Sequence, residues 1–121
     1  MKTISRGEVW LVNFEPSVGT EIQKIRPAVV VQEDGLSILE RTIVVPITSW
    51  KPIFASYVWM VCLQSTEQNG LTKESGADTL QTKSLDISRF QRYIGILRPN
   101  DMDDIATAIA LCVGYRGAQS E

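Results

Sequence analysis

The chain of 121 residues contains no histidine. This absence excludes serine–histidine and cysteine–histidine triads, histidine acid–base pairs and most zinc sites. The two cysteines, Cys62 and Cys112, form no CxxC pair and lie in apolar runs, so we expect buried free thiols rather than a zinc site. The carboxylates show no metal-binding cluster, because the aspartates near residue 101 are explained more simply by helix capping. We therefore expect no metal and no other cofactor.

Long apolar runs are also absent. No segment approaches the roughly 20 apolar residues that span a bilayer, and no apolar signal-peptide core follows Lys2. We expect a cytoplasmic protein with one domain, residues 1–121, and no membrane association. The net charge of −2 does not indicate a nucleic-acid-binding protein. Lys24, Arg26, Arg41 and Lys51 nevertheless gather in the first half, and a local basic face can coexist with an acidic total.

Short apolar runs predict a mainly β fold with one helix. Strands are expected at residues 8–14, 27–32, 41–47, 57–63, 76–83 and 93–97, with a short helical turn within 85–91. A helix is expected from Asn100, which would act as the N-cap, to a stop at Gly114. This order favours a small, strongly curved β-barrel with a C-terminal α-helix.

Arg26-Pro27 lies at the N-terminal end of the strand expected at 27–32, directly after a polar loop, residues 15–25. Proline biases Arg26 toward extended geometry, which suits a guanidinium aimed at an anion. The alternative is an edge arginine that covers one end of the barrel. If the strands at 27–32 and 41–47 are antiparallel neighbours, Arg26 and Thr48 lie at the same end. An arginine fork and a hydroxyl together would bind phosphate.

Other loop residues have two interpretations each. Glu21 could accept a proton or be a solvated loop charge. Thr48 and Ser49 could bind an anion or close the strand before them. Trp50 and Phe54 could stack on bases, at ~1–3 kcal/mol each, or fold back over the barrel end or against a second subunit. A third loop element combines Gln81-Thr82-Lys83 with Asp86 and Arg89.

Motifs along nearly the whole chain resemble the MazF/PemK family of toxin endoribonucleases from toxin–antitoxin modules. They are RGEVW at 6–10, EPSVGTE at 15–21, RPAVVV at 26–31, VPITS at 45–49, GL at 70–71, KES at 73–75, Gln81, and DISR at 86–89. The resemblance implies an SH3-like barrel, a homodimer and a cognate antitoxin partner. It also implies metal-independent cleavage of single-stranded RNA to 2′,3′-cyclic phosphate and 5′-hydroxyl ends, which would inhibit translation and growth.

The same resemblance implies roles for individual residues. It places the family's essential arginine on Arg26 and its threonine on Thr48, with Glu21 at a frequently acidic position. Because arginine is a poor proton acceptor, we expect Arg26 to bind phosphate. Leu80 departs from the pattern, since an acidic residue usually precedes the shared glutamine, and 78–80 do not reproduce the arginine and aspartate of some members. The predicted RNA-binding residues are Gly19, Thr20, Lys24, Ser49, Trp50, Lys51, Gln81 and Lys83.

Two other functional classes remain open at this point. One is a non-enzymatic toxin of the same barrel type that poisons a topoisomerase by protein contact, in which the C-terminal helix would matter and Arg26 would not. The other is an SH3-like protein-interaction module, in which the loop residues would be incidental.

Overall fold

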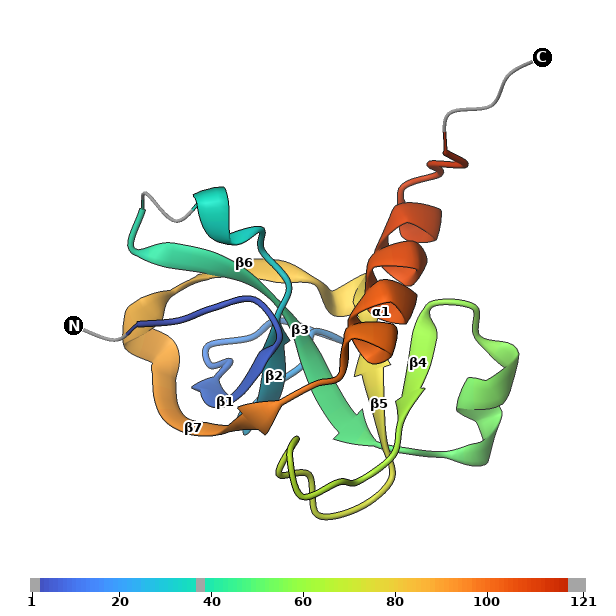
Figure 1. The fold of residues 1–121 in the computed structure, drawn as a ribbon, viewed down its shortest axis with the longest axis horizontal. Helices are drawn as coiled ribbons and strands as arrows, with labels where there is room; N and C mark the ends of the chain where they lie inside the picture. Colours follow the sequence, from blue (N-terminus) through green and yellow to red (C-terminus); the bar gives the residue numbers. More distant parts are fainter. Residues whose placement is uncertain (1–2, 37–38, 118–121) are drawn as a thin grey trace.

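The computed structural model describes residues 3–36 and 39–117 (Figure 1). The strands are β1 (Glu8–Asn13), β2 (Ile25–Val30), β3 (Arg41–Ser49), β4 (Met60–Leu63), β5 (Ser75–Asp78), β6 (Lys83–Asp86) and β7 (Phe90–Ile96). The described residues also form four 3₁₀ turns and one helix: η1 (Asp34–Leu36), η2 (Pro52–Ser56), η3 (Thr79–Gln81), η4 (Ile87–Arg89) and α1 (Pro99–Cys112). The predicted mainly β fold with a C-terminal helix is confirmed.

The strands form one seven-stranded antiparallel sheet in the order β4-β5-β3-β2-β1-β7, with β6 also pairing with β3. Val44 of β3 pairs with Val30 of β2 and with Lys83 of β6, so β2 and β6 lie on opposite edges of β3. Farther along β3, Thr48 pairs with Gly76 of β5. The long β3 therefore runs through the middle of the molecule, and α1 packs beside β4 and η3 (Figure 1).

Apolar side chains are buried on both faces of the central strands. Val29 and Val45 belong to a first hydrophobic cluster, which Met102 and Ile105 of α1 complete. Their sequence neighbours belong to a second cluster, whose buried members are Val12, Phe14, Ala28, Val30, Val44, Leu85 and Phe90. Because successive side chains on a strand point to opposite faces, the three consecutive valines of 29–31 suit a strand covered on both sides.

Several strand boundaries differ from the predictions. The second strand begins at Ile25, because Arg26 already pairs with Val12 of β1, so Arg26 lies within the strand. The third strand extends to Ser49, because β5 pairs with its last three residues, so Thr48 is a strand residue and not a loop residue. The fourth strand is shorter than expected and covers only Met60–Leu63. The strand expected at 76–83 is divided by η3.

The helix begins one residue earlier than predicted. Pro99 occupies its first turn after Arg98, so Asn100 is a helical residue and its expected role as N-cap is wrong. Proline suits this position because its fixed φ is already helical and its missing N–H is not needed there. The stop predicted at Gly114 is confirmed, since its φ is 79° and its N–H donates to the Leu111 carbonyl at 3.0 Å. None of the helices in the described residues is long and apolar enough to cross a membrane.

Both cysteines are free, as expected, but the expectation that both are buried is wrong. Cys62 is exposed, because it lies on β4 at the edge of the sheet. Cys112 is partly buried near the end of α1, where its sulfur lies 3.4 Å from the Thr79 hydroxyl.

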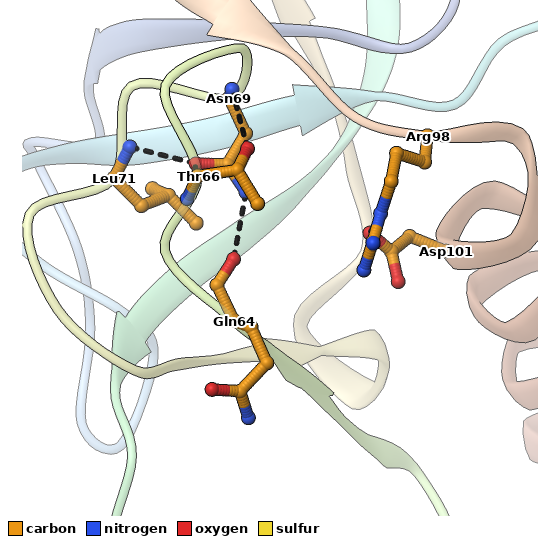
Figure 2. Close-up of polar contacts among 6 residues, drawn as sticks. All are labelled: Gln64, Thr66, Asn69, Leu71, Arg98 and Asp101. Carbon is orange, nitrogen blue, oxygen red and sulfur yellow. Dashed lines mark hydrogen bonds and ion pairs between the residues drawn. The ribbon is translucent and has the colours of Figure 1, made fainter.

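The β4–β5 loop, residues 64–74, is organised around Asn69, whose side chain is 2% exposed. Its Oδ1 accepts from the amides of Thr66 (3.1 Å) and Leu71 (2.9 Å), and its Nδ2 donates to the Gln64 carbonyl (2.8 Å). Figure 2 shows these residues converging on the Asn69 side chain. Gly70 suits this loop because its φ is +69° and a Cβ there would lie 2.4 Å from the Ile94 carbonyl oxygen. One buried side chain therefore shapes the loop from within.

Candidate functional site

Arg26 and Thr48 occupy matching positions on neighbouring strands. The register of β2 and β3 pairs Ala28 with Pro46 and Val29 with Val45. When this register is extended by two residues beyond Ala28, Arg26 falls opposite Thr48. Residues opposite each other in an antiparallel pair share a face of the sheet. The predicted antiparallel pairing of these two strands is thus confirmed, and it brings the two candidate residues to the same end of the strand pair.

The Arg26 guanidinium is oriented by the backbone. Its Nε donates to the Gln23 carbonyl at 2.8 Å. Among residues 3–36 and 39–117, its two terminal amino groups make no hydrogen bond or ion pair, and the side chain is partly exposed. A guanidinium held through Nε with its terminal fork unoccupied can receive two oxygens of a phosphate.

Thr48 lies beside a position without a side chain. Its partner Gly76 is covered by Trp50, since a Cβ at Gly76 would lie 3.1 Å from Trp50 Cε3 and 3.0 Å from Met60 Cε. The Thr48 hydroxyl is partly exposed and forms no hydrogen bond within the part of the chain that the structure describes. It is therefore available as a neutral donor at the same end of the β2–β3 pair as Arg26.

The β1–β2 loop, residues 14–24, is closed at its base by polar contacts. The Phe14 amide donates to the Lys24 carbonyl at 3.0 Å, and the Lys24 amide donates to Glu15 Oε2 at 2.6 Å. Arg89, from η4, donates through Nη1 to the carbonyls of Asn13 (3.2 Å) and Glu15. Thus a side chain more than 70 residues away in the sequence fastens the start of this loop.

Gln81 fastens the middle of the same loop. Its Oε1 accepts from the Ile22 amide at 3.0 Å, and its Nε2 donates to the Thr20 carbonyl at 3.1 Å. Glu21 lies between these two anchor points and is exposed, with Oε1 accepting from the Val18 amide at 2.8 Å. No ion pair or hydrogen bond joins Glu21 to Arg26 among the described residues. The Gln23 carbonyl, not the Glu21 carboxylate, therefore orients the guanidinium.

The remaining predicted RNA-binding residues lie at different distances from Arg26 and Thr48. Gly19, Thr20 and Lys24 are exposed on the β1–β2 loop, and Lys51 is exposed just beyond β3. The structure does not bring Lys83 to this end. It pairs with Val44, four residues or about 13 Å from Thr48 along β3.

Ser49 and Trp50 continue β3 past Thr48. Ser49 pairs with Ser75 of β5, and Trp50 is half-buried over Gly76. An aromatic series follows, with Trp50 edge-on to Phe54 at 5.5 Å between ring centroids and Tyr57 stacked on Trp59 at 4.6 Å. Trp50 therefore packs over Gly76, and Phe54 packs against the Trp50 ring.

Residues 5–113 match the protein family described as PemK-like, MazF-like toxin of type II toxin-antitoxin systems. The chain belongs to this family. Over 112 residues it is 32% identical to the Mycobacterium tuberculosis protein named Endoribonuclease MazF9, a match that covers 88% of this chain and 92% of that protein. The resemblance inferred from the sequence motifs is thereby confirmed.

Solved structures of toxins share the fold. MazF from Deinococcus radiodurans superposes with a TM-score of 0.76 at 20% identity, covering 94% of this chain and 99% of that one. An endoribonuclease in complex with its cognate antitoxin, from a Mycobacterial species, gives a TM-score of 0.72 at 18% identity, covering 93% and 96%. At these identities the structures establish a common fold.

This member of the toxin family also has a cavity of about 310 Å³ that sequence reasoning missed. Its walls include Leu11 of β1, Pro27 of β2, Arg92 of β7 and Leu71 of the β4–β5 loop. Pro27 and Arg26 are consecutive strand residues, so their side chains point to opposite faces. The cavity therefore lies on the other side of β2 from the guanidinium. No sequence pattern indicated it, because its walls come from separate segments.

Two carboxyl groups near η3 and η4 have shifted pKa values. Burial raises the pKa of Asp78, an effect that the backbone amides of Leu80 and Gln81 oppose, and its buried Oδ1 makes no hydrogen bond. The Ser88 amide, which donates to Asp86 Oδ1 at 2.9 Å, lowers the pKa of Asp86. In the described ranges, His, Cys, Asp and Glu form no group of three that could hold a metal ion.

Proposed function

We propose that this toxin is a metal-independent, sequence-selective endoribonuclease that cleaves single-stranded RNA at a phosphodiester bound by Arg26 and Thr48. The observation that carries the proposal is the β2–β3 register, which brings an unoccupied arginine fork and an unengaged hydroxyl to one end of the sheet. The similarity to a protein named an endoribonuclease supports it.

The chemistry follows from these two groups. The 2′-oxygen of a ribose attacks the adjacent phosphorus, the P–O2′ bond forms and the P–O5′ bond breaks. The 2′-hydroxyl loses a proton to a base, and the departing 5′-oxygen gains one, which leaves a 2′,3′-cyclic phosphate and a 5′-hydroxyl. The Arg26 fork stabilises the negative charge that grows on the phosphorane oxygens, and Thr48 donates to the same group. Glu21, at a position that is frequently acidic in the family, is our candidate for assisting this proton movement.

The partners follow from the same proposal. Cleavage of mRNA in the cytoplasm would inhibit translation and growth. A homodimer and a cognate antitoxin are expected, and the solved relatives include a toxin bound to its antitoxin. The antitoxin would block the site with an acidic segment, because such a segment mimics the charge of the RNA backbone. Lys24 and Lys51 are exposed beside Arg26 and Thr48 and suit contacts to the RNA backbone.

The test is cleavage of a single-stranded RNA in excess EDTA, with the ends mapped chemically. We expect cyclic phosphate ends, and we expect Arg26→Ala to lower kcat/KM by about 100- to 1000-fold, as removal of a transition-state donor does. Thr48→Val should cost less, because it removes a neutral donor. Arg41→Ala is the matched control, since Arg41 lies seven residues or about 23 Å from Thr48 along β3.

Full activity of Arg26→Ala would contradict the site assignment. Growth arrest without RNA cleavage would instead favour the non-enzymatic toxin that poisons a topoisomerase. The family match and the named endoribonuclease relative do not favour that alternative.

A further inference from the structure

Gln81 joins η3 to the β1–β2 loop, which lies 59 to 61 residues earlier in the sequence. It ends η3, on the edge of β3 opposite to β2, yet both polar atoms of its side chain bond to the β1–β2 loop. Oε1 accepts from the Ile22 amide and Nε2 donates to the Thr20 carbonyl, so the carboxamide spans the backbone of three consecutive loop residues, 20–22. Two opposed hydrogen bonds fix both the position and the orientation of that segment.

The clamped segment leads directly to the group that holds Arg26. Gln23 follows Ile22, and its carbonyl accepts from Arg26 Nε at 2.8 Å. A displacement of the Ile22 backbone therefore moves the carbonyl that orients the guanidinium. The path from Gln81 to Arg26 consists of two hydrogen bonds, Ile22 N–H to Gln81 Oε1 and Arg26 Nε–H to the Gln23 carbonyl, joined by the backbone from Ile22 to Gln23.

We infer that Gln81 is a positioning residue that holds the Gln23 carbonyl, and through it the Arg26 guanidinium, in place before RNA binds. The inference rests on the proposed function insofar as Arg26 binds the scissile phosphate. Without this clamp, the eleven-residue loop would become ordered only when RNA binds, and the free-energy cost of that ordering would weaken RNA binding. A catalytic group displaced by about 1 Å can lose about 100-fold in rate, so such a clamp matters for the chemical step.

This role differs from the direct RNA contact that the family resemblance implies for Gln81. Its Oε1 and its Nε2 each make one hydrogen bond to the loop backbone, so an RNA contact that replaced these bonds would release the segment next to Arg26. The role also differs from general stabilisation. The loop base is closed independently by Phe14, Lys24 and Arg89, so the loss of Gln81 should loosen residues 20–23 without opening the loop.

Two substitutions separate the functions of the side chain. Gln81→Met keeps its length and removes both polar atoms, whereas Gln81→Glu keeps an acceptor for Ile22 and removes the donor to Thr20. We expect kcat to fall about 10- to 100-fold in Gln81→Met, and at least as much in Gln81→Glu, in which a carboxylate oxygen would face the Thr20 carbonyl. KM should change by less than about threefold in Gln81→Met. Gln91→Met is the control, because Gln91 is exposed on β7. An increase in KM at unchanged kcat would indicate a direct RNA contact and overturn the inference.

A double-mutant cycle tests the path to Arg26. Arg26→Lys retains a charge but lacks the Nε–H that Gln23 accepts, so Gln81→Met should lower its kcat by less than about twofold further. Independent, multiplicative losses in the double variant would overturn the positioning role.

Cleavage after Glu21 by a glutamate-specific protease provides a readout that does not depend on RNA. Glu21 is exposed within the clamped segment, and we expect Gln81→Met, but not Gln91→Met, to be cut there several times faster than the parent protein. Unchanged cleavage would show that Gln81 does not hold the loop. If Arg26→Ala were fully active while Gln81→Met was cut faster, the assignment of Arg26 to the scissile phosphate would fail and the clamp would stand.

Discussion

The β1–β2 and β4–β5 loops are both eleven residues long, at 14–24 and 64–74, but different interactions hold them in place. The β4–β5 loop is shaped by its own residue Asn69, whose side-chain partners lie within five residues of it. The β1–β2 loop is fastened by Gln81 and Arg89, whose partners lie 59 to 76 residues away.

This difference predicts which loop contributes mainly to the stability of the fold and which contributes mainly to the alignment of the site residues. A buried asparagine that satisfies its own loop is part of the folded core, and its loss leaves buried amides unpaired. Gln81 bonds to the β1–β2 loop from a turn that is distant in the sequence, so it fixes the position of that loop relative to η3. We therefore expect the β4–β5 loop to affect mainly the free energy of unfolding, and the β1–β2 loop to affect mainly the activity of the folded protein.

The largest effect on stability is expected for Asn69→Ala. It removes three hydrogen bonds and leaves the amides of Thr66 and Leu71 without their acceptor, which should lower the free energy of unfolding by about 3 kcal/mol. Urea unfolding measures this change, and Asn100→Ala, at an exposed position of α1, should stay within about 0.5 kcal/mol. The RNase activity per folded molecule should be retained. A loss of kcat like that of Gln81→Met would break the comparison, because both loops would then align the site.

An intermediate effect is expected for Arg89→Met at the base of the β1–β2 loop. The substitution keeps much of the side-chain length and removes the donor to the Asn13 and Glu15 carbonyls, which should cost about 2 kcal/mol in urea unfolding. The rate of RNA cleavage should fall as well, because the loop base and Arg26 belong to the same segment. Arg92→Met, at an exposed position of β7, is the control. Lower stability with unchanged kcat would show that the loop base does not influence Arg26.

The sequence was sufficient to predict the part of the site that depends on neighbouring strands. Arg26 and Thr48 flank apolar runs on consecutive strands, so an antiparallel pairing brings them to one end. The extension of β3 through Ser49 was not predictable, because it depends on pairing with β5, which lies more than 20 residues later. The helix start was misplaced because Asn100 is a good N-cap, whereas Pro99 suits the first turn even better.

The clamp itself could not be read from the sequence. A glutamine carboxamide has no preferred partner, and its function here depends on the approach of two loops that lie 59 residues apart. Arg89 likewise gave no indication of its targets, since backbone carbonyls carry no sequence signature. Side chains that bond to the backbone of a distant segment are therefore the ones whose roles only the structure reveals.

The smallest effect is expected at Asp78, which precedes η3 and the Gln81 clamp. Asn69 has all of its buried polar atoms satisfied, whereas Asp78 has a buried Oδ1 without a partner and a raised pKa. The folded state therefore binds a proton more readily than the unfolded state, and the contribution of Asp78 to stability is lost as pH rises from its ordinary pKa through the raised value. Asp78→Asn should stabilise the protein slightly at pH 7, and this gain should vanish below about pH 4, where Asp78 is protonated in both states. Urea unfolding at the two pH values measures the change. A pH-independent difference would show that the ionised carboxylate is not the source of the cost, and that the turn bearing Gln81 is as well satisfied as the loop around Asn69.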